Sequence, residues 1–294
     1  MGVKVTVFTP TYNRGYIIEK CYTSLKRQTC KEFEWIIVDD GSTDNTEQMV
    51  TNWLKEKNEF NIIYKKTANG GKHRAINKAL DIANGRLFFI VDSDDYIVDD
   101  AIEKILKAEE TIKNSKEKYA GIAMAKGYDD KIIVGTTFKG DYLDATTLER
   151  EKYNINGDKA EIFYTDILKQ NKFPEFEGEK FLTEAVVWNR IAEKGYKIRW
   201  FQDIIYICEY REDGLTKQGI SKFKNSPKGL LLFIKEHISY GKLNFLRRCL
   251  QYEFYSRVVF DNKNIKQAAE DLETKRIYIY IGILLRKIVN LIRK

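Results

Sequence analysis

The feature that most constrains the fold is residues 87–91, five consecutive apolar residues that lie between Gly85-Arg86 and a run of carboxylates. An exposed strand would alternate apolar and polar residues, so this run predicts a strand buried on both faces, as in a parallel sheet. Asp92, Asp94 and Asp95 follow the run. Ligands of open α/β sheets bind at the carboxyl ends of the strands, so we expect these carboxylates in a ligand-binding loop.

Carboxylates crowded in this way repel one another unless a positive charge lies between them. A hard divalent cation such as Mn²⁺ or Mg²⁺, which binds carboxylate oxygens and a phosphate together, fits such a cluster. Aspartate is also common in turns, so an acidic turn in water is an equal alternative for this stretch alone.

Composition narrows the classes of protein that this chain fits. Its 294 residues are 43% hydrophobic, which is enough for a large folded core. The net charge of +7 suits nucleotide phosphates or an anionic membrane surface and is too weak to indicate a nucleic-acid-binding protein. Four cysteines without zinc spacing, and a strand pattern that begins without a signal peptide, favour the reducing cytoplasm.

Strand and helix patterns alternate through the first third of the chain, which predicts parallel βαβ units. Right-handed crossovers bring the carboxyl ends of such strands to one edge of the sheet. That edge then gathers Tyr12 and Arg14, the pair Asp39 and Asp40, and the acidic run. A tyrosine can stack on a base, and a carboxylate can accept the imide N–H of a uracil-like base. We expect Asp40 to bind the nucleotide and Asp39 to bond backbone amides.

Three segments, taken in order, resemble motifs of the family 2 glycosyltransferases. They are Val-Phe-Thr-Pro-Thr-Tyr-Asn-Arg at 7–14, Ile-Ile-Val-Asp-Asp-Gly-Ser-Thr-Asp-Asn-Thr at 36–46 and Phe-Ile-Val-Asp-Ser-Asp-Asp at 89–95. The resemblance covers about the first third of the chain and is looser beyond Ala120. It implies a GT-A fold, a nucleotide-sugar donor, a divalent metal ion at a D-x-D motif, and inversion at the anomeric carbon.

The resemblance also assigns roles to individual residues. Asp92 and Asp94 match the metal ligands, and Asp213 lies where many relatives carry a metal-binding histidine; a simple turn aspartate is the alternative there. Many relatives have arginine at the position of Ile76, so the charge facing the phosphates is expected from Lys72 or Arg74. The full set expected to bind the nucleotide-sugar is Thr9, Pro10, Thr11, Tyr12, Arg14, Asp40, Gly71, Lys72, Arg74, Asp92 and Ser93.

The general base is expected just before a helix predicted over residues 185–194. The family usually has an acidic pair here, but this chain reads Thr183-Glu184-Ala185, so the second acid of the pair is missing. Glu184 is the candidate base, and Glu179 is the alternative. A glutamate that only stabilises the first turn of the helix through its dipole is the structural interpretation.

The second half of the chain changes from mixed patterns to helices. We predict a hairpin within residues 119–134, a loop and short helix over 141–159, and a strand over 206–211. Helical patterns then cover residues 227–240, 244–261 and 265 to the end. The predicted domains are a catalytic GT-A domain over residues 1–218 and a helical extension over 219–294.

The last helical pattern is basic and amphipathic. Every charge from Lys275 onward is positive, and six apolar residues share one face: Ile281, Leu284, Leu285, Ile288, Leu291 and Ile292. Such a helix is typical of binding to an anionic membrane surface, and packing on the catalytic domain or in a homodimer is the alternative. The apolar run at 277–285 is too short to span a bilayer, which needs about 20 residues.

The sequence therefore predicts an α/β protein with the GT-A fold and a mainly parallel central sheet. The predicted activity is metal-dependent, inverting transfer of a hexosyl or N-acetylhexosaminyl group. The expected donor is a UDP-sugar, and the expected acceptor is a hydroxyl of a growing, free or lipid-linked surface glycan. The expected location is the cytoplasm or the cytoplasmic face of a membrane.

Two other classes remain open. A non-catalytic nucleotide-sugar-binding module would explain the missing acid at Ala185. A sugar nucleotidyltransferase should have a glycine-rich loop after the first strand, where this chain has Thr-Pro-Thr-Tyr at 9–12. Metal-dependent release of UDP from a donor would separate the three classes.

Overall fold

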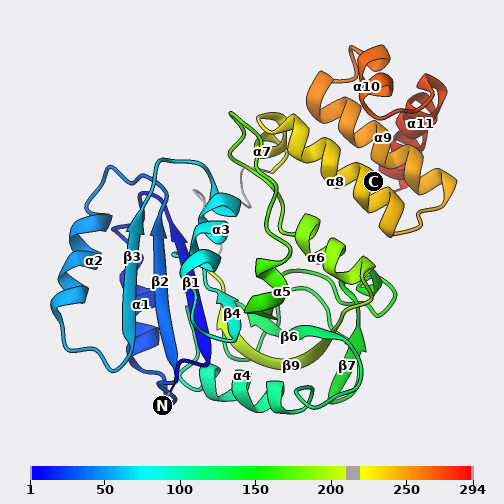
Figure 1. The fold of residues 1–294 in the computed structure, drawn as a ribbon. Coiled ribbons are helices and arrows are strands. Elements are labelled where there is room, and N and C mark those ends of the chain that lie inside the picture. Colours follow the sequence, from blue (N-terminus) through cyan, green and yellow to red (C-terminus); the bar gives the residue numbers. More distant parts are fainter. Residues whose placement is uncertain (1, 210–218, 293–294) are drawn as a thin grey trace. The chain divides into compact units, whose positions relative to one another are not determined.

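The computed structural model describes residues 2–209 and 219–292 of the chain. These form two compact units, each described here by itself (Figure 1). The first comprises residues 2–173 and 191–209, and the second comprises residues 174–190 and 219–292. The segment with Glu179 and Glu184 thus belongs to the same unit as the C-terminal helices. The boundary predicted at residue 218 lies outside the described residues and stays a prediction.

The first unit is built on a sheet in which the described residues form nine strands. Their order is β3-β2-β1-β4-β8-β6-β9-β5, and β7 pairs with β9. The strands are β1 (Val5–Thr11), β2 (Phe33–Asp39), β3 (Asn61–Lys66), β4 (Leu87–Ile90), β5 (Tyr96–Ile97), β6 (Tyr119–Gly127), β7 (Tyr142–Ala145), β8 (Lys159–Tyr164) and β9 (Lys197–Ile207). The α/β fold is confirmed, with a sheet that is parallel from β3 to β4 and mixed beyond β4.

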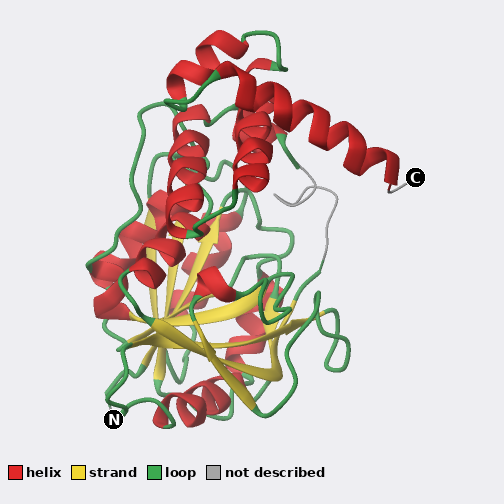
Figure 2. Cartoon of the chain, turned by 90° about the vertical axis from the view of Figure 1, so that its right-hand side faces the viewer, coloured by secondary structure: helices red, strands yellow, loops and turns green. Residues whose placement is uncertain are grey.

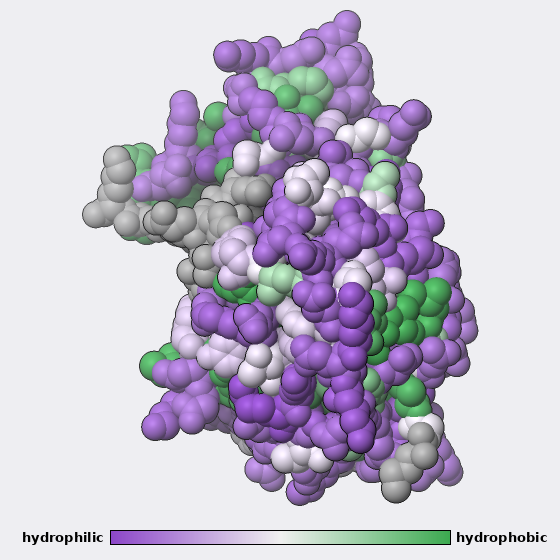
Figure 3. Space-filling view, turned by 90° about the vertical axis from the view of Figure 1, so that its left-hand side faces the viewer, coloured by the Kyte–Doolittle hydropathy of each residue, from purple (hydrophilic) through white to green (hydrophobic). Residues whose placement is uncertain are grey.

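Helices cover both faces of this sheet (Figure 2). Those of the first unit are α1 (Glu19–Lys26), α2 (Thr46–Lys55), α3 (Lys72–Ile82), α4 (Ala101–Glu110), α5 (Thr165–Lys169) and the 3₁₀ helix η1 (Thr147–Glu149). The face of this unit that carries α2 is mainly hydrophilic (Figure 3). Beneath it, the rings of Tyr22, Trp35 and Trp53 stack with centroids 4.4 to 5.8 Å apart. These aromatic contacts fix α1 and α2 against β2.

The central strand is buried as predicted. Leu87, Phe88 and Phe89 are almost completely shielded from solvent, and the backbone of β4 pairs with β1 on one side and with β8 on the other. Phe8 of β1 is level with Ile90 of β4, and both strands run in the same direction. Their carboxyl ends therefore lie at the same edge of the sheet, together with that of β2.

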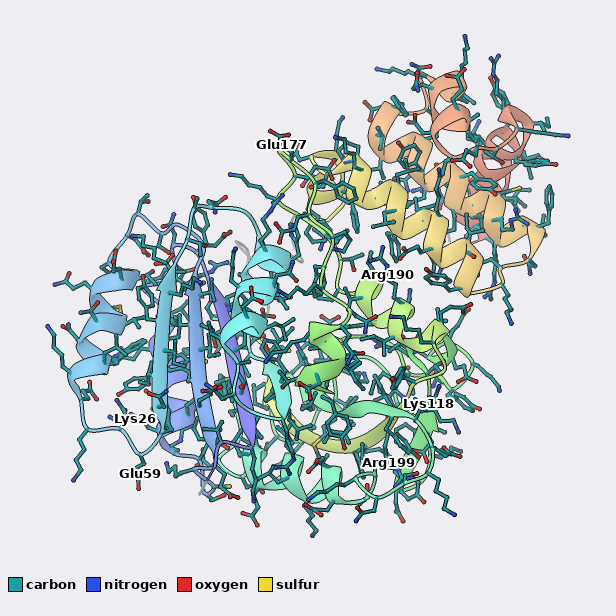
Figure 4. The ribbon with its side chains drawn as sticks, in the orientation of Figure 1. Lys26, Glu59, Lys118, Glu177, Arg190 and Arg199 are labelled. Atoms are coloured by element: carbon teal, nitrogen blue, oxygen red, sulfur yellow. The ribbon has the colours of Figure 1, made fainter. Side chains whose placement is uncertain are left out.

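Two predictions for residues 119–159 are only partly right: the short helix predicted within 141–159 is present as η1, and the turn predicted near Gly127 is present. The segment 141–159 contains a strand, β7, which pairs antiparallel with β9 and is held by the bidentate ion pair of Asp144 with Arg199 (Figure 4). The predicted hairpin is only a turn with one isolated bridge between Gly127 and Ile133. The backbone of β6 instead pairs with the distant strands β8 and β9, which local patterns do not reveal.

The strand predicted at 206–211 is also misplaced. The observed strand β9 runs from Lys197 to Ile207, so the prediction overlaps only its last two residues. Mixed charged and apolar residues hide the earlier part of β9, because this strand is half-buried along much of its length.

The second unit is helical. Its elements are α6 (Ala185–Glu193, whose last residues belong to the first unit), α7 (Ser221–Lys224), α8 (Pro227–Tyr240), α9 (Phe245–Phe260), α10 (Ile265–Asp271) and α11 (Arg276–Ile292). Leu230, Ile234, Tyr255 and Ile279 are among the residues that form its own core. Arg190 of α6 forms a bidentate ion pair with Glu236 of α8 (Figure 4). The described residues contain no helix with the length and hydropathy of a membrane span.

One correction concerns the last helix. A single helix was expected from residue 265 onward, but the chain breaks between α10 and α11. Glu273 adopts a left-handed conformation with φ of 52°, which an α-helix does not accommodate. The break lets α11 turn back and pack on α9.

Replacing Leu87 with Ala tests the buried position of β4. We expect Leu87→Ala to lower the free energy of unfolding by about 2–5 kcal/mol, because it leaves a cavity in a fully buried site. Leu54→Ala, at an exposed position of α2, is the matched control and should cost about 0.5 kcal/mol or less. Urea unfolding followed by tryptophan fluorescence measures both. Equal losses in the two variants would contradict the buried position.

Candidate active site

The loops that follow β1 and β2 are joined by hydrogen bonds between side chains and backbone. The amide of Asn13 donates to Oγ of Ser42 at 2.9 Å, and the amide of Thr43 donates to Oδ1 of Asn13 at 2.8 Å. The amide of Gly15 donates to Oδ2 of Asp44 at 3.0 Å. These polar residues of the second motif therefore shape the two loops, a structural role that explains their small, hydrogen-bonding side chains.

The residues predicted in the first loop separate into two groups. Thr9 is buried, and its hydroxyl accepts a hydrogen bond from Nε1 of Trp35 at 2.9 Å, so it belongs to the core. Pro10 is half-buried. Thr11 is also buried, but its hydroxyl has no hydrogen-bond partner among the described residues. Tyr12 is 48% exposed. Thr11 and Tyr12 thus present groups that a ligand could bind.

Asp39 and Asp40 both bond within the protein. Oδ1 of Asp39 accepts a hydrogen bond from the amide of Ser42 at 2.7 Å, as expected, and its Oδ2 accepts one from the hydroxyl of Tyr64 at 2.7 Å. The two carboxylate oxygens of Asp40 accept hydrogen bonds from the amides of Gly70 and Gly71, each at 2.7 Å. Asp40 therefore holds the loop that leads into α3, a contact that the sequence did not predict.

That loop delivers a lysine to the acidic cluster. Gly71 has a φ of 94°, which glycine adopts readily, and it is the N-cap of α3. Lys72 is the first residue of the helix, and its Nζ lies 2.7 Å from Oδ1 of Asp92. Arg74 lies two residues further along the helix and donates to the carbonyl of Gly70 at 2.6 Å. Lys72, one of the two predicted cations, thus contacts an aspartate of the acidic cluster.

The carboxylates after β4 differ in their electrostatic surroundings. Burial raises the pKa of Asp92, but the positive charges of Lys72 and Lys126 outweigh it and hold the pKa below its usual value. The pKa of Asp94 is raised by burial and by the negative charge of Asp92. Arg14 lies close enough to lower the pKa of both carboxyl groups. The negative charge of Asp92 is thus balanced by nearby cations, whereas burial and repulsion by Asp92 disfavour a negative charge on Asp94.

Asp95 has a separate, structural role. Its Oδ2 accepts a hydrogen bond from the hydroxyl of Tyr206 at 2.7 Å, and this hydroxyl accepts one from the amide of Asp92 at 3.0 Å. Burial and the charge of Asp92 raise the pKa of Asp95 to about 7. Ser93 is buried between these aspartates. Tyr206 therefore fixes the backbone of the acidic loop.

Sequence reasoning missed two residues of this site, Lys126 and Tyr206. Nζ of Lys126 lies 3.9 Å from the centroid of the Tyr206 ring, a cation–π distance, and its charge acts on Asp92. Lys126 follows the apolar run 119–125, so a charge at the end of a strand was visible in the sequence. Nothing in the sequence shows that β6 and β9 reach β4.

Asp92 and Asp94 fit a divalent cation by their chemistry. Both are oxygen ligands, and the repulsion that raises the pKa of Asp94 is the kind that a bound cation relieves. Among the described residues, however, no three acidic, histidine or cysteine side chains converge as a metal site. Asp213, the third predicted ligand, lies outside the described residues.

Glu179, one of the two candidate bases, caps a helix. It is buried in the second unit, and its carboxylate accepts hydrogen bonds from the amides of Lys228 and Gly229 at the start of α8, both at 2.8 Å. A carboxylate stabilises this end of a helix through the unpaired amides and the helix dipole. The geometry favours a structural role for Glu179.

Glu184 lies directly before α6, as predicted. It is half-buried, and its carbonyl accepts hydrogen bonds from the amides of Val187 and Trp188. The hydroxyl of Thr183 lies 3.4 Å from the amide of Ala185, which agrees with the predicted N-cap. Glu184 thus remains the candidate base in this segment.

Comparison with known proteins agrees with the motifs. A model of the family described as Glycosyl transferase family 2 matches residues 6–115. The chain is 30% identical over 231 residues to "Glycosyltransferase GlyG" of Streptococcus pneumoniae, and the match covers 74% of each chain. It is 28% identical over 222 residues to "GalNAc(5)-diNAcBac-PP-undecaprenol beta-1,3-glucosyltransferase" of Campylobacter jejuni, with 72% of this chain and 67% of the relative covered.

A solved structure supports the fold. The crystal structure of residues 1–349 of S. aureus TarS in complex with UDP-GlcNAc superimposes with a TM-score of 0.62. The two sequences are 22% identical, and the match covers 97% of this chain and 92% of that one. The similarity therefore extends beyond the segment that carries the three motifs.

Replacing Glu179 with Gln tests its structural role. We expect Glu179→Gln to lower the free energy of unfolding by about 1–2 kcal/mol, because the amide loses the charge-assisted bonds to α8. Glu177→Gln, at an exposed position of the same segment, should leave stability unchanged (Figure 4). Thermal unfolding by circular dichroism measures both. A stable Glu179→Gln variant would show that the cap does not matter.

Proposed function

This chain belongs to glycosyl transferase family 2, and we propose that it transfers a sugar from a UDP-sugar to a hydroxyl of a growing surface glycan. The proposed reaction inverts the anomeric carbon and depends on a divalent metal ion. The observation that carries the proposal is the acidic loop after β4, where Asp92 and Asp94 lie among the positive charges of Arg14, Lys72 and Lys126. Alternating charges of this kind suit a diphosphate and a cation.

The nucleotide is proposed to bind at the carboxyl ends of β1 and β2. Tyr12 offers an exposed ring for stacking, and Thr11 offers a buried hydroxyl that bonds to no other described residue. Asp40 uses both oxygens to hold the loop at Gly70, yet each carboxylate oxygen can accept a second hydrogen bond. Asp40 can therefore bind the imide of uracil without releasing that loop.

The diphosphate is proposed to lie between the basic side chains and the acidic loop. Asp92 and Asp94 would hold Mn²⁺ or Mg²⁺, which when bound neutralises charge on the departing nucleotide. Lys72 is paired with Asp92 at 2.7 Å, so a phosphate that attracts its ammonium group competes with this ion pair. Arg74 and Gly71 shape the loop beneath the phosphates.

Glu184 is the proposed general base. It would take the proton from the acceptor hydroxyl as this oxygen attacks the anomeric carbon opposite the departing diphosphate. A single displacement of this kind gives inversion. For the acceptor we propose a free or lipid-linked glycan, because the Campylobacter relative is named for an undecaprenol-linked substrate.

The two alternative functions have less support than sugar transfer. No observation on the described residues favours a sugar nucleotidyltransferase. A non-catalytic binding module would keep the nucleotide site and lose the base, so the variants of Glu184 decide between this module and an enzyme.

Replacing Asp94 with Asn tests the metal proposal. We expect Mn²⁺ to strengthen UDP binding to the wild-type protein and to have little effect on Asp94→Asn, because the amide removes one anionic ligand. Titration calorimetry with UDP, with and without Mn²⁺, is the measurement.

The control for this experiment is Asp99→Asn, which removes an exposed carboxylate that pairs with Arg27 outside the site. It should keep the full effect of Mn²⁺. If Asp94→Asn also keeps that effect, Asp94 is not a metal ligand.

Replacing Glu184 with Gln tests the base. We expect the turnover of Glu184→Gln to fall by about 10²–10⁴-fold while UDP binding is preserved, because the amide keeps the shape of the side chain but cannot take a proton. UDP release from a panel of UDP-sugars, with acceptor glycans present, measures turnover.

Glu179→Gln provides the comparison, since its carboxylate caps α8. It should lose stability and keep turnover at temperatures where it is folded. Normal turnover in Glu184→Gln would remove Glu184 as the base, and a loss confined to Glu179→Gln would transfer the role to Glu179.

A further inference from the structure

The C-terminal helix α11 presents an apolar face to solvent. Ile277, Tyr280, Leu284, Ile288 and Leu291 are between 45% and 74% exposed. They recur at intervals of three and four residues, so they lie within about a third of the helix circumference. The last turns of α11 extend beyond the other helices of the second unit (Figure 2). This face, defined by these five residues, is the exposed face of α11.

The opposite side of α11 is fixed to α9. Ile279 is completely buried, and a Cβ atom at Gly282 would lie 2.1 Å from the carbonyl oxygen of Cys249, so the two backbones are in close contact. Arg286 lies 3.3 Å from Glu253, a buried carboxylate of α9. These contacts hold α11 in one orientation, so the exposed face of α11 cannot turn inward to pack on its own unit.

The charges on α11 select the class of partner. Residues 274–294 include six basic residues and no acidic one. Arg276 and Lys287 follow the helical spacing on one flank of the exposed face of α11, and both belong to its solvent-exposed residues. An apolar stripe with basic residues beside it complements a surface with an apolar interior and anionic groups at its edge.

We propose that the exposed face of α11 binds an anionic lipid surface, with α11 parallel to the membrane plane. Its apolar side chains enter the boundary between headgroups and acyl chains, Tyr280 places its ring there and its hydroxyl in the headgroups, and Arg276 and Lys287 contact lipid phosphates. A second copy of the chain is a poorer partner, because two α11 helices side by side would bring basic residues together with no acidic residue to pair them.

Vesicle binding of the full chain tests this proposal. The wild-type protein should float with vesicles that contain phosphatidylglycerol and bind weakly to pure phosphatidylcholine. The double variant Leu284→Glu, Ile288→Glu should bind the anionic vesicles at least about a hundredfold more weakly, because two apolar side chains that enter the lipid become charged. Arg276→Gln and Lys287→Gln should each weaken binding about five-fold.

The matched control is Leu54→Glu, which places the same charge on an exposed leucine of α2 in the other unit. It should bind vesicles like the wild type. Because all substituted residues are exposed, circular dichroism should show unchanged helix content. The assay contains no donor and no metal ion, so its outcome is independent of the proposed transfer reaction.

Three results would overturn the proposal. One is equal binding to neutral and anionic vesicles, and another is unchanged binding of the double variant. The third is a wild-type dimer, detected by light scattering, that becomes monomeric in the double variant, because the exposed face of α11 would then be covered by a second copy.

Discussion

The ion pair between Lys72 and Asp92 is the interaction on which the arrangement of the site depends. Its geometry begins at β2, where Asp40 binds the amides of Gly70 and Gly71. These glycines set the start of α3, and the first residue of that helix is Lys72. The ends of β2 and β4, which lie on either side of β1, are thereby linked through one loop. A change at Asp40 would act through this loop on the region proposed to bind the phosphates, as well as on the proposed contact with the base.

Family motifs in this chain combine two kinds of residue. Ser42, Asp44 and Thr9 bond to backbone or core groups and fix the loops. Tyr12 and Thr11 have a ring and a hydroxyl that the protein itself does not use. The short side chains of the first kind allow the two loops to approach closely. The motifs thus contain residues that build the loops of the candidate site as well as residues whose groups a ligand could bind.

The sequence predicts the elements that depend on local patterns. The apolar run at 87–91 contains β4, and the predicted bounds of α8, residues 227–240, match the structure, since Pro227 begins that helix. Elements that depend on distant pairing were missed. β7 has only four residues, and its place is set by β9, more than fifty residues later.

The same limit applies to individual residues of the site. The strand-end aspartates and Lys72 could be identified from their positions in the motifs. The role of Glu179 could not, because the amides that it binds are about fifty residues away. Tyr206 was also missed, since its hydroxyl reaches Asp92 and Asp95 only after β9 has joined the sheet.

The position of β9 also affects the order of assembly during synthesis. β1 to β4 pair with one another within the first 90 residues, so this half of the sheet can form early. β8, β6 and β9 complete the sheet only when the chain has reached residue 207. Long-range pairing of this kind is slow compared with local structure. One edge of β4 stays open until β8 has been made, and the acidic loop lacks Tyr206 until β9 has been made, so the nascent chain acquires the shape of the candidate site late and exposes an unpaired strand edge beforehand.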